Sequence, residues 1–403
     1  MQLAFLVVHS CPLGQPGSVN TGGMNVYVRD LALNLVKLGH SIDIYTRQHP
    51  GSEPQIVNIV PGMRVIHVSD SNIEETDKQK MYQNIPQFTL NLERFCQTNN
   101  LRYDLVFSHY YISGRLGVTL QERWHVPHLT MFHTLGIVKN ALKINENEPE
   151  ARLSAERYVA QKCDRIIATT PREKLTLSGG LNVNPQKIAV IPCGVDLELF
   201  HTLDKKFCRQ KLNLAADAQL VLFVGRVEKI KGIERLLEAI ALLKDSKHLR
   251  LLIVGGDRED HSKIELMKDQ TRNLGIEYLT EFHNAVPQEE LLDYYNSADI
   301  LVMPSFSESF GMVALEALAC GTPVVANRVG AMDSIIINGK NGFLILDNTP
   351  DLLAEAINLV LVNPGKLLTA TIRNSVVRYG WPRISTAISD ECKQLERNFE
   401  ARK

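Results

Sequence analysis

The sequence lacks a hydrophobic run long enough to cross a membrane, since nowhere do about 18 apolar residues follow one another. Its first apolar stretch, Leu3–Val8, is short and has no cationic segment before it. We therefore expect neither a signal peptide nor a transmembrane segment. The sequence also has no marked excess of positive or negative charge, because its 44 Lys+Arg and 45 Asp+Glu give a net charge of −1. A basic surface for nucleic acid thus has no support from composition.

Disulfide and cofactor patterns are also absent. The seven cysteines are odd in number and show no C-x-x-C spacing, which predicts reduced thiols in a cytoplasmic protein, without a disulfide framework or a zinc site. Neither the G-x-G-x-x-G dinucleotide fingerprint nor the G-x-x-x-x-G-K-[ST] phosphate loop occurs. This excludes a fingerprint-bearing dinucleotide enzyme and a P-loop nucleotidase.

The sequence does contain an alternation of short apolar runs with longer amphipathic segments, and Pro and Gly interrupt it near Ile191–Val195. This pattern predicts two α/β domains, 1–193 and 194–380, each with a parallel sheet covered on both faces. A further helix is expected after Trp381. The expected strands are Leu3–Val8, Ile42–Thr46, Tyr103–Ser108, His128–Phe132, Arg165–Ala168, Leu220–Val224, Leu249–Val254, Ile300–Met303 and Pro323–Ala326, and the expected helices include Val26–Lys37, Glu150–Lys162, Gly232–Leu243, Glu289–Ser297 and Val313–Ala319.

Several groups of residues stand at the carboxyl ends of predicted strands, where ligands of open α/β sheets bind. Gly22 and Gly23 precede a helix whose terminal amides favour an anion, although a turn that needs positive φ explains them equally well. The loop from His9 to this pair includes Pro16, Gly17 and Thr21. Arg226 and Lys231, beside glycines, can clamp a diphosphate, although cationic loops are more often simply solvated.

Two glutamates, Glu308 and Glu316, flank the start of another predicted helix. Their carboxylates can accept hydrogen bonds from sugar hydroxyls, and the amides of Ser309–Met312 favour an anion. The alternative is a solvated Glu308 and a salt-bridged Glu316.

Histidine and tyrosine side chains follow two strands of the first half. His133 comes after His128–Phe132; a lone histidine is more often a core residue, but this position favours function. His109 and Tyr110 are expected to line the same cleft, with Tyr111 on the opposite side if the strand continues.

Together these residues resemble a known family. The spacing from Glu308 to Glu316 resembles the E-x7-E signature of the retaining glycosyltransferases of family 4. The Gly-Gly loop, His133 and the Arg226/Lys231 pair stand in the order that this family shows. The resemblance runs from Leu3 to about Trp381. It implies the GT-B fold, in which two doubly wound, Rossmann-like α/β domains face a cleft, and a hexosyltransferase whose C-terminal helix, 381–403, crosses back to the first domain.

Within the family, four segments are most similar to a branch that transfers N-acetylglucosamine to inositol phosphate at the start of mycothiol synthesis. They are His9–Gly17, Gly22–Val28, Ser108–Gly114 and His133–Asn140. The resemblance implies UDP-N-acetylglucosamine as donor and 1D-myo-inositol 3-phosphate as acceptor. Sucrose-phosphate synthases share the Gly-Gly loop but usually have Gln where Met24 stands here.

The resemblance implies that the second domain binds the UDP-sugar. Arg226 and Lys231 would bind the diphosphate and Glu316 the ribose, while Glu308 would hold the sugar with His133 near its C6 hydroxyl. The implied catalytic residues are His133, Arg226, Lys231 and Glu308, and the implied donor-binding residues are Gly23, Val286, Ser309, Phe310, Gly311, Met312 and Glu316.

The first domain would bind the acceptor. Asn25 would meet the acceptor ring, and the remaining residues would supply the donors that a phosphomonoester needs. The implied set is Asn25, Tyr110, Thr134, Arg152 and one lysine, Lys78 or Lys80. Two departures concern the substrates: Lys143–Arg152 is shorter than in the resembled branch, and Val286 replaces an arginine near the uracil, which leaves backbone groups to recognise the base.

The family's chemistry implies front-face substitution, in which the UDP phosphate leaves and takes the acceptor's proton. No D-x-D motif occurs, so we expect no metal-bridged diphosphate; Mg²⁺ is allowed but takes no part in catalysis. The alternatives are a sucrose-phosphate synthase or another family 4 transferase, a UDP-sugar 2-epimerase, and a nucleotide-sugar-binding protein without turnover. The Arg226/Lys231 pair with E-x7-E argues against the epimerase. A homodimer is left open.

Overall fold

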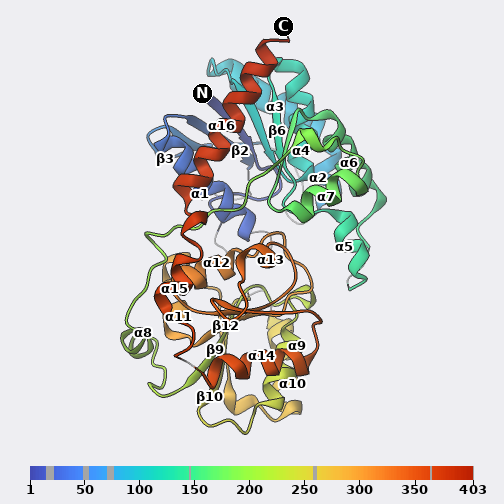
Figure 1. Ribbon diagram of the computed structural model, residues 1–403. Helices are drawn as coiled ribbons and strands as arrows, with labels where there is room; N and C mark the ends of the chain where they lie inside the picture. The colour runs from blue at the N-terminus through green and yellow to red at the C-terminus, as the bar shows by residue number, and fades with distance from the viewer. Residues whose placement is uncertain are drawn as a thin grey trace. The chain divides into compact units, whose positions relative to one another are not determined.

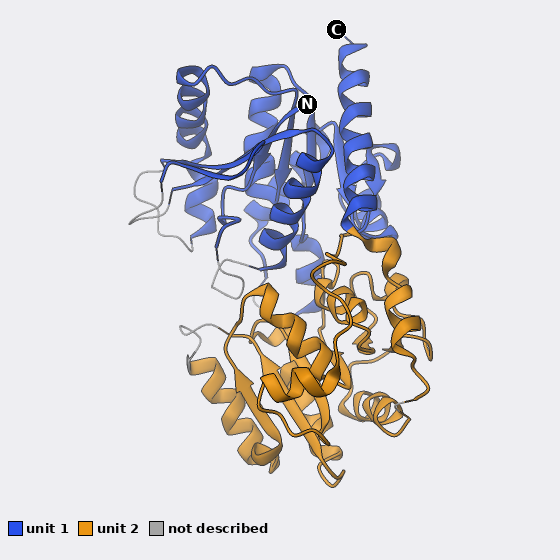
Figure 2. Ribbon diagram, turned by 90° about the vertical axis from the view of Figure 1, so that its left-hand side faces the viewer, with its two compact units in different colours: residues 1–14, 20–192, 381–403 blue, residues 15–19, 193–380 orange. Residues whose placement is uncertain are grey.

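The structure is a computed structural model that describes residues 1–14, 22–48, 54–69, 77–144, 147–256, 261–363 and 365–402. Pro16, Gly17 and Thr21 of the predicted first loop lie outside these ranges. The described residues form two compact units (Figure 2): 1–14, 22–192 and 381–402 make up unit 1, and 193–380 make up unit 2. Within the described ranges, no helix is long and apolar enough to cross a membrane.

Unit 1 is built on one sheet in the order β3-β4-β2-β1-β5-β6-β7-β8, with all neighbours parallel except β3 and β4. Its strands β2, β3 and β6 are labelled in Figure 1. The strands are β1 (Gln2–Leu6), β2 (Ser41–Arg47), β3 (Ile56–Val60), β4 (Met63–Val68), β5 (Leu105–His109), β6 (His128–Met131), β7 (Arg165–Ala168) and β8 (Ile188–Val190). The α-helices are α1 (Gly23–Lys37), α2 (Lys78–Gln83), α3 (Ile85–Thr98), α4 (Tyr111–Trp124), α5 (Gly136–Leu142), α6 (Glu150–Lys162), α7 (Pro171–Gly180) and α16 (Trp381–Glu400).

Unit 2 has a parallel sheet in the order β11-β10-β9-β12-β13-β14. The strands are β9 (Gln219–Val224), β10 (Leu249–Val254), β11 (Thr280–His283), β12 (Ile300–Met303), β13 (Val324–Asn327) and β14 (Gly342–Ile345). The α-helices are α8 (Lys205–Lys211), α9 (Ile233–Leu242), α10 (His261–Leu274), α11 (Gln288–Ser297), α12 (Met312–Ala319), α13 (Met332–Ile335), α14 (Pro350–Leu361) and α15 (Thr369–Asn374).

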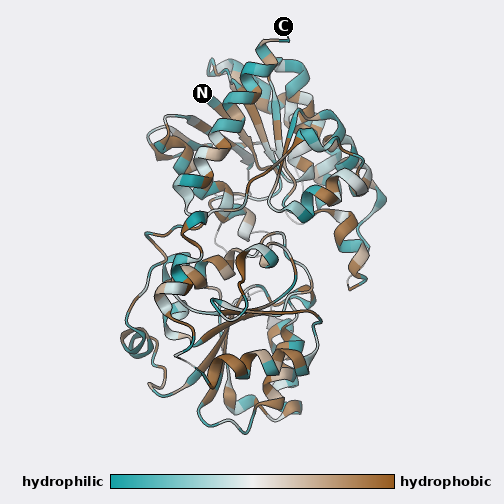
Figure 3. Cartoon of the chain, viewed as in Figure 1, coloured by the Kyte–Doolittle hydropathy of each residue, from teal (hydrophilic) through white to brown (hydrophobic). Residues whose placement is uncertain are grey.

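Both sheets reverse their strand order once, between β1 and β5 in unit 1 and between β9 and β12 in unit 2. In a doubly wound sheet, loops diverge at such a switch point and leave room for a ligand beyond the strand ends. The central strands are continuous apolar runs because helices cover both of their faces. This is evident in unit 2, whose strands are mostly brown in Figure 3. The prediction of two doubly wound sheets is confirmed.

Strands β3, β4, β8, β11 and β14 were not predicted. Three of them, β8, β11 and β14, have only three or four residues, whereas β4 is a six-residue, mostly buried strand that the sequence pattern missed. Edge strand β3 is apolar except at Asn58, which interrupts its apolar run, and none of its residues is buried. Strand β5 does not continue towards Tyr111, so the condition under which Tyr111 was expected on the opposite side is not met. It ends at His109, and Tyr110 takes a positive φ of 77°. This turns the chain so that α4 begins at Tyr111.

Helix α16 belongs to unit 1 although it ends the chain. His40 Nε2 lies 2.8 Å from Ser389 Oγ, and Arg165 Nε is 2.8 Å from Glu391 Oε2. The Trp381 ring lies 5.5 Å from the Tyr27 ring of α1. All seven cysteines are buried, and no disulfide links them in the described part of the chain.

Candidate active site

In unit 2, the loops that follow β9 and β12 meet through an ion pair. Lys231 Nζ lies 2.7 Å from Glu308 Oε1, and their side chains are only 22% and 12% exposed. Ser305 Oγ, at the end of β12, donates to the same oxygen over 2.7 Å. The Glu308 carboxylate is therefore paired with Lys231 and held in place by Ser305, so the alternative of a solvated Glu308 is wrong.

Glycine at position 232 allows these two loops to approach. Gly232 has a φ of 69°, and a Cβ there would lie 2.1 Å from the carbonyl oxygen of Pro304. The amide of Phe306 donates to the carbonyl of Ile230 over 2.9 Å. Since Gly232 caps α9, the helix begins at Ile233 and not at Gly232 as predicted.

Arg226 and Glu316 are the two other charged residues of the predicted donor site. Arg226 precedes Lys231 by five residues, and Glu316 follows Glu308 by eight. Arg226, the more exposed cation, pairs with Glu228 over 2.8 Å. Glu316 is buried in α12 and accepts hydrogen bonds from Tyr295 Oη (2.6 Å) and Gln288 Nε2 (3.3 Å). Burial, and then the Glu316 charge, raise the pKa of Tyr295 well above its ordinary value, so this phenol stays a donor.

The segment before α12 contains the other predicted donor-binding positions. Gly311 is the N-cap with a φ of 103°, and α12 begins at Met312, one residue before the predicted start at Val313. Ser309 and Phe310 therefore precede the helix. Phe310 is buried against Tyr379. Val286, in the loop between β11 and α11, is half-buried.

In unit 1, the loop after β1 meets the end of β5. The His9 ring lies 4.2 Å from the Tyr110 ring, and Lys78 Nζ lies 5.8 Å from the centre of the Tyr110 ring. Burial, with Lys78 as the largest charged contributor, lowers the pKa of His9 well below its ordinary value. Lys80, in contrast, is exposed and lies 3.5 Å from Asp77.

Arg152 is almost completely buried beside the same tyrosine. The Tyr110 and Tyr111 rings lie 5.1 Å and 5.3 Å from its guanidinium carbon, so both tyrosines contact the same arginine. Arg152 Nη2 donates to Thr134 Oγ1 over 3.0 Å. Tyr110, Thr134, Arg152 and Lys78 are thus brought together, whereas Lys80 is not.

Glu156 is the residue of this region that sequence reasoning missed. Its buried carboxylate accepts Arg152 Nε over 2.7 Å and the Gly136 amide over 2.9 Å. Glu148 pairs with Arg152 over 2.8 Å. The spacing of Arg152 and Glu156, one turn apart on one helix, was the available signal.

Asn25 and Gly23 lie at the start of α1. Asn25 Nδ2 donates to Ser10 Oγ (2.7 Å) and to the Cys11 carbonyl (2.8 Å), and Oδ1 accepts the Gly22 amide (3.2 Å). Asn25 therefore ties the loop after β1 to the helix. Gly23 is exposed as the first residue of the helix.

His133 follows β6 with a φ of 59° and is half-buried. His109 was expected to line the cleft with it, but its exposure is 0%. Its Nδ1 lies 3.0 Å from His133 Nε2, so His109 stands behind His133. Tyr110 and His133 are both non-glycine residues with a positive φ, and both follow neighbouring strands of the sheet. Such strained backbone conformations cluster at functional sites.

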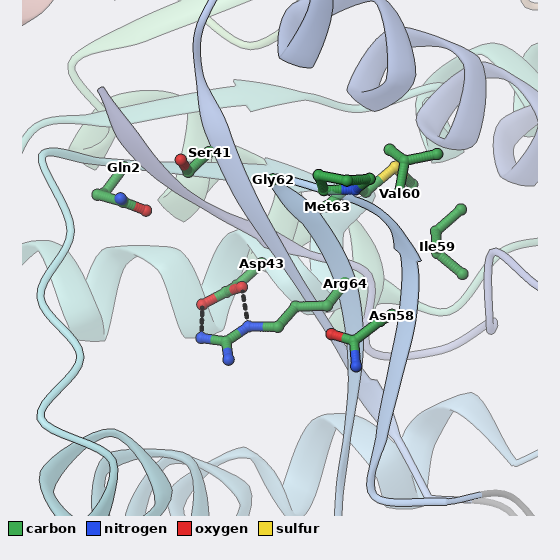
Figure 4. A pocket seen from close by; sticks show the side chains of 10 residues that line it. Gln2, Ser41, Asp43, Asn58, Ile59, Val60, Gly62, Met63 and Arg64 are labelled. Carbon is green, nitrogen blue, oxygen red and sulfur yellow. Dashed lines mark hydrogen bonds and ion pairs between the residues drawn. The ribbon is translucent and has the colours of Figure 1, made fainter.

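A separate concavity of about 540 Å³ lies at the amino ends of β1, β2 and β4, away from these loops (Figure 4). There Asp43 accepts Arg64 Nε over 2.5 Å and Tyr103 Oη over 2.5 Å. These groups satisfy one another, which indicates a structural network. In the ranges that the structure describes, no three His, Cys, Asp or Glu side chains cluster as metal ligands.

Comparison with known proteins identifies the family. The model of Glycosyltransferase Family 4 matches residues 21–199, and that of Glycosyl transferases group 1 matches residues 204–376. The D-inositol 3-phosphate glycosyltransferase 2 of Catenulispora acidiphila is 38% identical over 401 residues, or 96% of this chain and 94% of the relative. The chain belongs to glycosyltransferase family 4.

Other family members and solved structures are similar over at least 90% of the chain. The D-inositol 3-phosphate glycosyltransferase of Corynebacterium diphtheriae is 35% identical over 369 residues, or 90% of this chain and 86% of the relative. The structure of sucrose-phosphate synthase from Thermosynechococcus elongatus aligns with a TM-score of 0.90 at 30% identity, covering 98% of both chains. The Anabaena protein HepE, in complex with UDP and glucose, aligns with a TM-score of 0.76 at 20% identity, covering 98% of this chain and 100% of HepE. The GT-B fold and glycosyltransferase activity are therefore established.

Proposed function

We propose that this glycosyltransferase transfers N-acetylglucosamine from UDP-N-acetylglucosamine to 1D-myo-inositol 3-phosphate. The observation that carries the proposal is the convergence of Lys78, Tyr110, Thr134 and Arg152 beyond the carboxyl ends of β5 and β6. Cations and hydroxyl donors at one place suit a phosphomonoester. The names of the relatives from Catenulispora acidiphila and Corynebacterium diphtheriae support the same acceptor.

Unit 2 would bind the nucleotide sugar. Lys231 and Arg226 would neutralise the diphosphate, which requires Lys231 Nζ to exchange part of its contact with Glu308 for a phosphate oxygen. The freed carboxylate of Glu308 then accepts a hydroxyl of the donor sugar. Glu316, held by Tyr295, would accept the ribose hydroxyls, and Ser309–Met312 would supply amides.

The chemical step would be a front-face substitution with retention. The bond between the sugar C1 and the β-phosphate oxygen breaks, and a bond between C1 and the acceptor oxygen forms on the same face. The acceptor hydroxyl's proton passes to the departing phosphate oxygen, so UDP leaves. Lys231 and Arg226 would stabilise the charge that develops on UDP, as preorganised donors do at other leaving groups.

The direct test is product analysis after incubation with UDP-N-acetylglucosamine and 1D-myo-inositol 3-phosphate. We expect a product with the mass of an N-acetylglucosaminyl inositol phosphate and the small anomeric proton coupling of an α-linkage. A β-linked product would contradict front-face retention. A product containing no phosphate would contradict the acceptor.

Removing the charge of Lys78 tests the phosphate site. Lys78→Met is expected to raise the acceptor KM roughly 10–100-fold, because a hydrogen bond to a charged group contributes about 1.5–3 kcal/mol. Hydrolysis of the donor without acceptor should stay unchanged. The measurement is initial-rate kinetics of UDP release.

Lys80→Met is the matched control, since Lys80 lies in the same helix but pairs with Asp77. Its acceptor KM should stay within about twofold of the native value, as for other surface substitutions. Equal effects of the two variants would argue against a phosphate contact at Lys78.

The second candidate is sucrose-phosphate synthase, which the TM-score of 0.90 favours. Its acceptor, fructose 6-phosphate, is also a phosphomonoester and would suit the same cations. The donor would then be UDP-glucose. The two functions differ in which acceptor stimulates turnover.

A further inference from the structure

His109 is a polar side chain in an apolar place. Its exposure is 0%, and its ring lies 4.4 Å from Phe107, 5.3 Å from Phe5 and 6.2 Å from Tyr27. An unbonded polar group at such a position costs free energy that an apolar side chain would avoid. Its hydrogen bond with His133 is therefore the feature that explains a histidine here.

The partner ring belongs to a residue in a strained conformation. His133 has a φ of 59°, where a non-glycine residue costs about 1 kcal/mol or more. Its Nε2 lies 3.0 Å from His109 Nδ1. The His133 ring also packs edge-on against the Tyr27 ring, with centroids 5.4 Å apart. The hydrogen bond with His109 then fixes which ring nitrogen of His133 points inward.

The contact also determines where the protons lie. Burial lowers the pKa of His133 to about 3 and that of His109 well below its ordinary value, so both rings are neutral at pH 7 and each carries one proton. The hydrogen bond between His109 Nδ1 and His133 Nε2 contains a single proton, so one of these two nitrogens donates and the other accepts.

One of the two arrangements leaves a buried donor without a partner. If His133 donated, the proton of His109 would be on Nε2, which is buried and has no hydrogen-bond partner among the described residues. Orphaned buried N–H groups are rare. If His109 donates from Nδ1 instead, His133 must carry its proton on Nδ1.

We propose that His109 is a positioning residue that donates its Nδ1 proton to His133 Nε2 and thereby fixes His133 as the Nδ1-protonated tautomer. This rests on the proposed function, together with the family resemblance, which implies that His133 lies near the C6 hydroxyl of the donor sugar. His133 then presents an N–H donor to a sugar hydroxyl oxygen and cannot act there as an acceptor or base.

The tautomer can be read directly in the ligand-free protein labelled with ¹⁵N-histidine. We expect ¹H–¹⁵N correlation spectra to show His133 with the proton on Nδ1, with the assignment made by loss of the signal in His133→Asn. His109→Phe should abolish this preference. It should also lower kcat/KM for the donor by about fivefold to tenfold, the effect of one net hydrogen bond.

Two further variants separate positioning from packing. His109→Asn keeps a donor near the Nδ1 position and should recover part of the lost kcat/KM. His128 is also fully buried and bonds Ser108 Oγ over 2.7 Å through its Nε2, but at the start of β6. His128→Asn should lower stability and leave the His133 tautomer unchanged.

A native His133 signal with the proton on Nε2 would overturn the proposal, and this result does not depend on whether any variant folds. So would His109→Phe with the native tautomer and a kcat/KM within about twofold of the native value. If the tautomer is as expected but no acceptor is used, the proposed function fails while the His109–His133 arrangement stands.

Discussion

Replacing Lys231 with methionine is expected to lower kcat by about 10²–10³-fold, the usual loss when one preorganised donor to a developing negative charge is removed. Lys231 is the cation that lies between the two loops at the switch point of unit 2, 2.7 Å from Glu308. Methionine keeps most of the side chain's length and apolar volume while removing the charge. The measurement is steady-state UDP release at saturating donor and acceptor.

Lys229→Met is the matched control for this prediction. Lys229 lies in the same short helical turn but is exposed, so its kcat should stay within about threefold of the native value, as expected for a solvated surface charge. Arg226→Ala is expected to show a loss in the same range as Lys231→Met. A Lys231→Met enzyme with native kcat would refute the role of this lysine at the leaving group.

Replacing Glu156 with leucine is expected to lower the free energy of unfolding of unit 1 by about 3–5 kcal/mol, because it leaves the buried charge of Arg152 without its closest partner. Glu156 is 0% exposed and also holds the Gly136 amide. Both tryptophans of the chain, Trp124 and Trp381, belong to unit 1. Urea unfolding followed by tryptophan fluorescence therefore reports on this unit.

An exposed acid on the same helix provides the comparison. Glu150 pairs with Arg157 over 3.4 Å at the surface, so Glu150→Gln should cost less than about 1 kcal/mol. The double variant Arg152→Met with Glu156→Leu should be more stable than Glu156→Leu alone, because no buried guanidinium then remains without its closest carboxylate. A Glu156→Leu protein as stable as Glu150→Gln would contradict this structural role.

The Arg152–Glu156 pair also changes how the acceptor site can be tested. Arg152→Ala would have two effects at once. It would remove a hydrogen-bond donor to the acceptor's phosphate, and it would leave the buried Glu156 carboxylate without its cation. Lys78 is exposed, and Glu156 keeps its contact with Arg152 when Lys78 is replaced, which makes Lys78 the cleaner test of phosphate binding.

The repeating pattern of apolar strands was sufficient to predict both doubly wound sheets. Strands such as Leu220–Val224 and Ile300–Met303 are buried on both faces, so their apolar runs are unbroken. Edge strand β3 and the short β8 bury less and gave no comparable signal. Local sequence also could not show that Tyr110 has a positive φ, because tertiary packing imposes that conformation.

The candidate site was predictable in its residues but not in its contacts. The resemblance named Lys231 and Glu308, yet their ion pair joins positions 77 residues apart, and only the folded sheet brings them together. The choice of Lys78 over Lys80 depends on which side of the first turn of α2 faces Tyr110. Ser305 and Glu156 act on other predicted residues through hydrogen bonds, and a single sequence carries little trace of such indirect roles.

The most direct measurement is UDP release from UDP-N-acetylglucosamine with and without 1D-myo-inositol 3-phosphate, with UDP-glucose plus fructose 6-phosphate and unphosphorylated myo-inositol run in parallel. We predict stimulation by the inositol phosphate alone. Stimulation only by fructose 6-phosphate with UDP-glucose would assign the sucrose-phosphate reaction. Equal stimulation by myo-inositol would contradict the phosphate site at Lys78, Tyr110, Thr134 and Arg152.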